Sequence, residues 1–159
     1  MQESSRPSQK PTLVVGSDHA GFALKSRLKS ALIADGYRVI DVGTEDGTTS
    51  VDYPDFARAA ASHVVSGAAR FGVLVCGTGI GISIAANRDP RIRCALVHDT
   101  TTAHLAREHN DANMIAFGGR IISEDVALDA LRAFLAATYE GGRHAKRVAK
   151  LGEQLEPIG

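Results

Sequence analysis

This sequence has little of several features that mark whole classes of protein. It contains two cysteines, Cys76 and Cys94, too few for a disulfide framework or a four-cysteine zinc site. Its 18 basic and 18 acidic residues balance, which removes any global electrostatic argument for binding nucleic acid or a membrane surface. No apolar run approaches the length of a membrane span, and the first residues lack the apolar segment of a signal peptide. We therefore expect reduced thiols and a cytoplasmic protein.

The order of apolar and polar residues predicts the fold. A tail rich in Ser, Pro and Gln (1–11) is expected to be disordered, and the rest (12–159) to form one domain. Short apolar runs predict strands over 13–16, 37–42, 71–76, 93–97 and 114–117. Between and after them, helices are predicted over 20–35, 54–66, 81–87, 101–109, 124–139 (with Ser123 as N-cap) and 143–156. This alternation predicts a three-layer α/β/α sandwich with a five-stranded parallel, Rossmann-like sheet plus a C-terminal helix.

Parallel sheets of this kind bind ligands beyond the carboxyl ends of their strands. Several chemically reactive or glycine-rich segments follow predicted strands: Asp18-His19, Cys76-Gly77-Thr78-Gly79, His98-Asp99 and Gly118-Gly119-Arg120. The sequence therefore predicts that the functional groups gather at this edge of the sheet.

The segment from Cys76 to Gly81 is a cysteine followed by a glycine-rich turn. A dinucleotide-binding fingerprint requires glycine or alanine at position 82, and a thiol phosphatase loop requires arginine there. Ile82 occupies this position, so the segment is neither of the two. It also lacks the Gly-Lys-Ser/Thr ending of a P-loop. A turn that leads into a helix N-terminus attracts anions, stabilises an oxyanion and favours a thiolate. The alternative is a tight turn beside an inert cysteine, but the strand-end position and three glycines favour a functional thiol.

Other candidate residues have competing interpretations. Asp18 and His19 could cap the first helix. His109 precedes a polar cluster, while His98, at a strand end, is a rival acid or base. Arg143 and Arg147 lie one helical turn apart, which suits either a phosphate clamp or a solvated helix face. Nucleic acid is a weaker interpretation, because no aromatic side chains interleave with this basic patch.

Together these motifs resemble the sugar-phosphate isomerase family that contains type B ribose-5-phosphate isomerase and the galactose-6-phosphate isomerase subunits. The resemblance covers roughly residues 13–155. It rests on Gly16-Ser17-Asp18-His19-Ala20-Gly21, Asp52-Tyr53-Pro54-Asp55, the segment from Cys76 to Asn87, Arg107-Glu108-His109-Asn110-Asp111-Ala112-Asn113 and Tyr139-Glu140-Gly141-Gly142-Arg143-His144.

The resemblance implies an aldose–ketose isomerase of the pentose phosphate pathway that needs no metal or cofactor. It would interconvert ribose 5-phosphate and ribulose 5-phosphate through an enediolate. Cys76 would be the base and His109 the acid–base that opens the sugar ring. Asp18 and Asn110 would bind the hydroxyl groups of the sugar. The enediolate would be stabilised by the turn residues Gly77, Thr78, Gly79, Ile80 and Gly81. The substrate, chiefly its phosphate, would be bound by His19, Arg120, Arg143 and Arg147.

The resemblance also implies a homodimer or a dimer of dimers with active sites at the subunit interface, and no nucleic-acid or membrane partner. Two alternatives stay open. One is an isomerase of a six-carbon sugar phosphate, of the galactose 6-phosphate or allose 6-phosphate type, because pocket length is not readable from sequence. The other is a phosphate-binding module without catalysis.

Overall fold

The computed structural model describes residues 9–158. Residues 1–8 of the predicted tail lie outside this range. The strands are β1 (Thr12–Ser17), β2 (Arg38–Asp41), β3 (Phe71–Cys76), β4 (Cys94–Leu96) and β5 (Met114–Gly118). The helices are α1 (Phe22–Ala34), α2 (Tyr53–Val65), α3 (Ile80–Ala86), α4 (Thr100–Glu108), α5 (Glu124–Ala136) and α6 (Ala145–Leu151), with a 3₁₀ turn, η1 (Gly142–His144), before α6.

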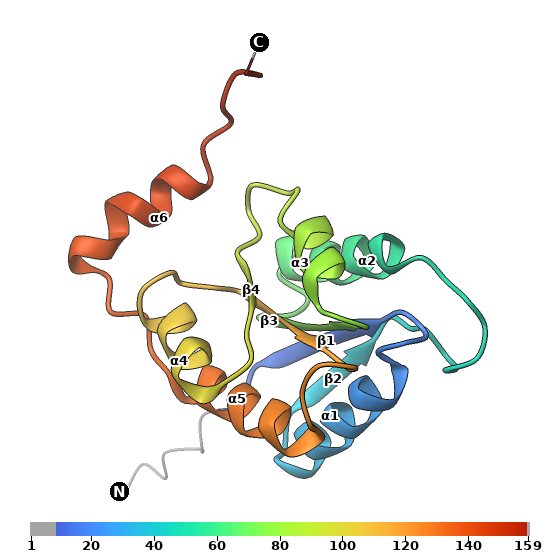
Figure 1. The fold of residues 1–159 in the computed structure, drawn as a ribbon. Helices are drawn as coiled ribbons and strands as arrows, with labels where there is room; N and C mark the ends of the chain where they lie inside the picture. Colours follow the sequence, from blue (N-terminus) through green and yellow to red (C-terminus); the bar gives the residue numbers. More distant parts are fainter. Residues whose placement is uncertain (1–8, 159) are drawn as a thin grey trace, which may run out of the picture.

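The five strands form one parallel sheet in the order β2-β1-β3-β5-β4. Side chains of successive residues point to opposite faces of the sheet. Val15 and Val73 belong to the apolar layer shared with α1, α4 and α5, whereas Val14 and Leu74 belong to the layer shared with α2 and α3 (Figure 1). The predicted three-layer α/β/α sandwich is therefore confirmed.

The ends of the elements follow local chemistry. β3 is buried along its whole length, as its unbroken apolar run predicts. α5 begins where predicted, because the Ser123 side chain accepts a hydrogen bond from the Val126 N–H at 3.2 Å. It ends at Ala136, three residues before the predicted end.

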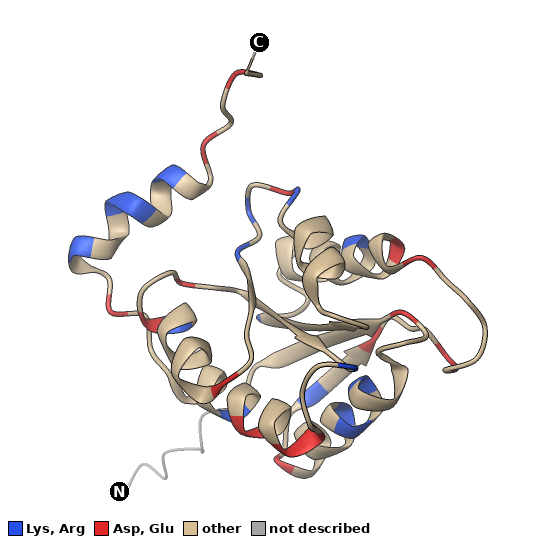
Figure 2. Ribbon diagram, viewed as in Figure 1, with Lys and Arg blue, Asp and Glu red and all other residues tan. Residues whose placement is uncertain are grey.

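The predicted last helix is the least accurate element. The chain forms η1 over Gly142–His144, and α6 ends at Leu151 instead of near residue 156. No residue of α6 is buried, so no packing stabilises further turns. Figure 1 shows α6 extending away from the layers of the sandwich, and Figure 2 shows that its charged positions are all basic.

The topology separates two edges of the sheet. All strands are parallel, so their carboxyl ends share one edge, and each connecting helix returns the chain to the opposite, amino edge. α4 begins just after β4, and its nine residues span about 14 Å at 1.5 Å per residue. The residues that follow α4 and precede β5 therefore lie at the amino edge.

Candidate active site

The turn after β3 holds the Cys76 thiol at the carboxyl edge. Cys76 is 4% exposed, and its Sγ accepts a hydrogen bond from the Gly79 N–H at 3.1 Å. Gly79 has a left-handed φ of +77°. A Cβ there would come within 2.6 Å of Leu96 Cδ1 and 2.8 Å of the Phe117 carbonyl carbon. Only glycine therefore lets this turn close over the sulfur.

The turn after Cys76 carries several backbone donors. The Ile80 N–H donates to Thr78 Oγ1 at 3.2 Å. Among residues 9–158, the N–H groups of Gly77, Thr78 and Gly81 have no hydrogen-bond acceptor. Arg120 adds a positive charge, since its guanidinium lies 3.3 Å from the Cβ position of Gly77. The turn can thus stabilise negative charge that develops on a bound oxygen.

A depression of about 480 Å³ contains the residues that follow β1. Asp18 is 6% exposed, and its Oδ1 accepts the Gly21 N–H at 3.0 Å. His19 Nδ1 accepts the Val51 N–H at 3.1 Å, which leaves the proton of a neutral ring at Nε2. The depression is lined by Asp18, His19, Val51, Asp52, Tyr53, Pro54, Asp55 and Arg58.

Tyr53 links this depression to the glycine turn. A Cβ at Gly81 would be only 2.5 Å from Tyr53 Cζ, so the phenol ring lies directly against the glycine. Tyr53 was not among the predicted site residues. The signal that could have identified it is the Asp52-Tyr53-Pro54-Asp55 motif, one of the segments that carry the family resemblance.

His109 lies at the amino edge, where it is the C-cap of α4. Its ring stacks on that of His144, with centroids 4.3 Å apart and ring planes 17° from parallel. Arg143 donates to Glu140 Oε1 at 3.0 Å. Burial of the His144 ring, reinforced by the positive charge of Arg143, lowers the pKa of His144.

The predicted site residues therefore fall into two groups within one chain. The carboxyl-edge group is Asp18, His19, Cys76, Gly77, Thr78, Gly79, Ile80, Gly81 and Arg120, and the amino-edge group is His109, Asn110, Arg143 and Arg147.

His98 is exposed and follows β4 at the carboxyl edge. It lies two strands from β3, or about 10 Å at ordinary strand spacing. Within a single chain, His98 is thus nearer to Cys76 than His109 is.

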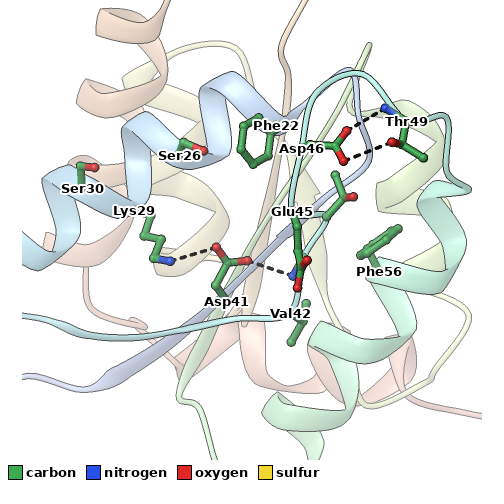
Figure 3. A pocket seen from close by; sticks show the side chains of 12 residues that line it. Phe22, Ser26, Lys29, Ser30, Asp41, Val42, Glu45, Asp46, Thr49 and Phe56 are labelled. Carbon is green, nitrogen blue, oxygen red and sulfur yellow. Dashed lines mark hydrogen bonds and ion pairs between the residues drawn. The ribbon is translucent and has the colours of Figure 1, made fainter.

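A cavity of about 890 Å³ lies at the β2 side, between α1, the loop after β2 and Phe56 of α2 (Figure 3). Its charged walls are mainly acidic. Asp41 pairs with Lys29 at 3.1 Å, and Asp46 accepts hydrogen bonds from Thr49. With Glu45 as a third carboxylate, this cavity repels a phosphorylated sugar.

The fold and the turn define an α/β protein that can hold a small anion against a buried thiol. The sequence profile of the family described as Ribose/Galactose Isomerase matches residues 13–151. The chain belongs to this family of isomerases, as the sequence motifs predicted.

Relatives cover nearly the same length. Ribose-5-phosphate isomerase B of Escherichia coli is 43% identical over 136 residues, which cover 86% of this chain and 91% of that protein. The ribose-5-phosphate isomerase B structure from Clostridium thermocellum is 48% identical, with a TM-score of 0.87, and the match covers 89% of this chain and 95% of that one. The Mycoplasma genitalium enzyme with bound ribulose 5-phosphate is 35% identical, with a TM-score of 0.84, covering 88% and 93%. No helix among residues 9–158 has both the length and the apolar character needed to cross a membrane.

Proposed function

We propose that the chain interconverts ribose 5-phosphate and ribulose 5-phosphate through an enediolate, at sites shared between two copies of the chain. The observation that carries the proposal is the Cys76 sulfur, which accepts the Gly79 N–H at 3.1 Å beside unpartnered backbone donors. Hydrogen bonds of this type are strongest when the acceptor is ionised. The names of the relatives, and the ribulose 5-phosphate bound to the Mycoplasma genitalium enzyme, support the choice of substrate.

In the proposed reaction, His109 first opens the furanose ring by moving a proton from the anomeric hydroxyl to the ring oxygen. The Cys76 thiolate then takes the proton from C2, which gives an enediolate, and returns it to C1. A second proton passes from O2 to O1. The N–H groups of the turn stabilise the negative oxygen of the intermediate. The atoms balance without any redox change.

Phosphate binding belongs to the basic groups near α6. Arg143 and Arg147 are both exposed, and guanidinium groups bind phosphate oxygens in bidentate fashion. Binding the phosphate far from C1 and C2 uses remote binding energy to orient the reacting carbons.

The need for two copies follows from the separation of the two edges. Proton transfer requires heavy atoms about 3 Å apart, whereas α4 alone spans about 14 Å between the edges. We therefore assign Cys76 and His109 of one site to different chains. Ile80 and Ile84, 53% and 58% exposed, lie one turn apart on α3 beside the cysteine turn. They supply an apolar surface for the second copy.

A coupled isomerase assay with ribose 5-phosphate, galactose 6-phosphate and allose 6-phosphate tests this function. We expect turnover of ribose 5-phosphate, and a loss of roughly 1000-fold in kcat for Cys76→Ala with ligand binding retained. Cys94→Ala is the matched control, because burial raises the pKa of Cys94 to about 12 and keeps that thiol neutral. Near-normal activity of Cys76→Ala would refute the proton-transfer role. Preference for a six-carbon substrate would reassign the enzyme, and binding without turnover would indicate a phosphate-binding module.

A further inference from the structure

Three potential metal ligands meet at the amino edge of the sheet. His109, Glu140 and His144 each offer one ligand atom, and these atoms all lie within 4.8 Å of one another. They come from two segments of chain: His109 caps α4, while the other two lie in and before η1. The Glu140 N–H donates to the Glu108 carbonyl oxygen at 2.9 Å, which fastens the second segment to the end of α4. The three ligands are thus brought together by the backbone.

The Nε2 atom of His144 is buried and has no hydrogen-bond partner among the described residues. His144 as a whole is 8% exposed. The nearest carboxylate oxygen, Glu140 Oε2, is 3.8 Å away, which is too far for a hydrogen bond. A buried nitrogen without a partner loses its hydrogen bonds to water and gains none in return, so such atoms are uncommon in folded proteins. A cation between Nε2 and Oε2 would satisfy both atoms.

We propose that His109, Glu140 and His144 form a binding site for a divalent transition-metal ion of the zinc type. Two imidazoles and one carboxylate are a ligand set that zinc uses when its fourth position stays open. Calcium and magnesium prefer oxygen ligands and are disfavoured here. Arg143 occupies only Oε1 of Glu140, so Oε2 is available to the metal.

The distances between the ligand atoms need a small adjustment, and the two imidazole rings must also turn out of their stack. A metal bound to both rings lies in both ring planes, whereas these planes are 17° from parallel with centroids 4.3 Å apart. Tetrahedral zinc with bonds of about 2.1 Å separates its ligand atoms by roughly 3.4 Å. The three atoms must therefore approach one another by no more than about 1.4 Å from their limit of 4.8 Å. Glu140 can move its carboxylate toward the rings, because its side chain is 44% exposed. His109, with a side chain that is 33% exposed, can turn out of the stack.

The site has a functional consequence that rests on the proposed role of His109. A metal ion on His109 takes the lone pair that ring opening requires. No metal takes part in the proposed reaction, so binding would inhibit the enzyme reversibly and a chelator would restore activity. This inhibition would couple sugar-phosphate turnover to the availability of the metal.

Zinc titration followed by calorimetry, on protein freed of metal and without substrate, tests the site independently of catalysis. We expect one Zn²⁺ per chain, a tetrahedral visible spectrum for Co²⁺, and at least a tenfold loss of affinity in His144→Gln and in Glu140→Gln. Glu140 is an exposed side chain, so its variant tests the site even if His144→Gln folds poorly. His104→Gln is the control for the neighbouring pair, because His104 binds Glu108 Oε2 at 2.8 Å in a part-buried contact and is not one of the three ligands. The other oxygen of Glu108 lies 3.5 Å from His109 Nε2, so this control reports whether Glu108 takes part in holding the metal.

Unchanged zinc affinity in His144→Gln and Glu140→Gln would overturn the proposal. Equal loss in His104→Gln, or complete loss in Cys76→Ser, would also overturn it by assigning the metal to another site. An enzyme that binds zinc at the predicted residues but isomerises no sugar would refute the proposed function and leave the metal site standing.

Discussion

Replacing Gly79 with alanine should damage stability and catalysis together. The left-handed φ of +77° costs an alanine about 1–2 kcal/mol. Its Cβ would also overlap Leu96 and the Phe117 backbone, and overpacking of this kind costs about 1–3 kcal/mol. We therefore expect Gly79→Ala to lower the free energy of unfolding by about 2–5 kcal/mol in urea denaturation. Displacing its N–H from Cys76 removes a hydrogen bond worth about 1.5–3 kcal/mol to a charged acceptor, so kcat should fall roughly 10- to 100-fold.

Gly67→Ala measures the cost of placing alanine in a left-handed backbone conformation without any steric overlap. Gly67 has a similar φ of +82°, but a Cβ there meets nothing within 4 Å. This variant should lose only about 1–2 kcal/mol and keep the wild-type kcat. If Gly79→Ala were no less stable than Gly67→Ala and equally active, the idea that the closed turn positions the thiol would be refuted.

Two further predictions concern charged groups. Lys25→Met should lower the free energy of unfolding by about 3 kcal/mol in urea denaturation, because Lys25 is 1% exposed and pairs with Asp41 at 2.8 Å. Lys29→Met removes a more exposed partner of Asp41 and should lower it by less than about 1 kcal/mol. Equal losses in the two variants would contradict the role of burial. In steady-state kinetics, Arg147→Ala should raise KM for ribose 5-phosphate with little change in kcat. Lys146→Ala, on the same helix, should change neither constant. An unchanged KM in Arg147→Ala would refute the phosphate clamp.

Sequence reasoning was most accurate where burial and local chemistry agree. β3 has the predicted ends, Phe71 and Cys76, because a continuous apolar run is bounded by a glycine turn. The start of α5 follows from the Ser123 cap. The end of α6 could not be predicted, since a polar helix without buried residues has no periodic pattern that marks its last turn.

The candidate residues came from sequence motifs, and their sharing between two chains was expected only from the family resemblance, not from the residues themselves. The motifs of Cys76 and His109 are specific, yet their order in the chain does not say that they lie at opposite edges. That information was available in part, because a residue between a helix and the next parallel strand must lie at the amino edge. The stacking of His109 on His144 and the contact of Tyr53 with Gly81 depend on tertiary packing, which no local pattern encodes.

The central claim is that each active site combines Cys76 of one chain with His109 of another. Subunits of Cys76→Ala and His109→Ala, each inactive alone, can be mixed by unfolding and refolding them together, and assayed with ribose 5-phosphate. Random pairing makes half of the dimers mixed, and each mixed dimer holds one intact site of two, so we predict about a quarter of wild-type activity. A mixture no more active than its inactive parents would contradict the account and place both groups within a single chain. A His109→Ala parent that is itself active would instead assign the acid–base role to another group, such as His98.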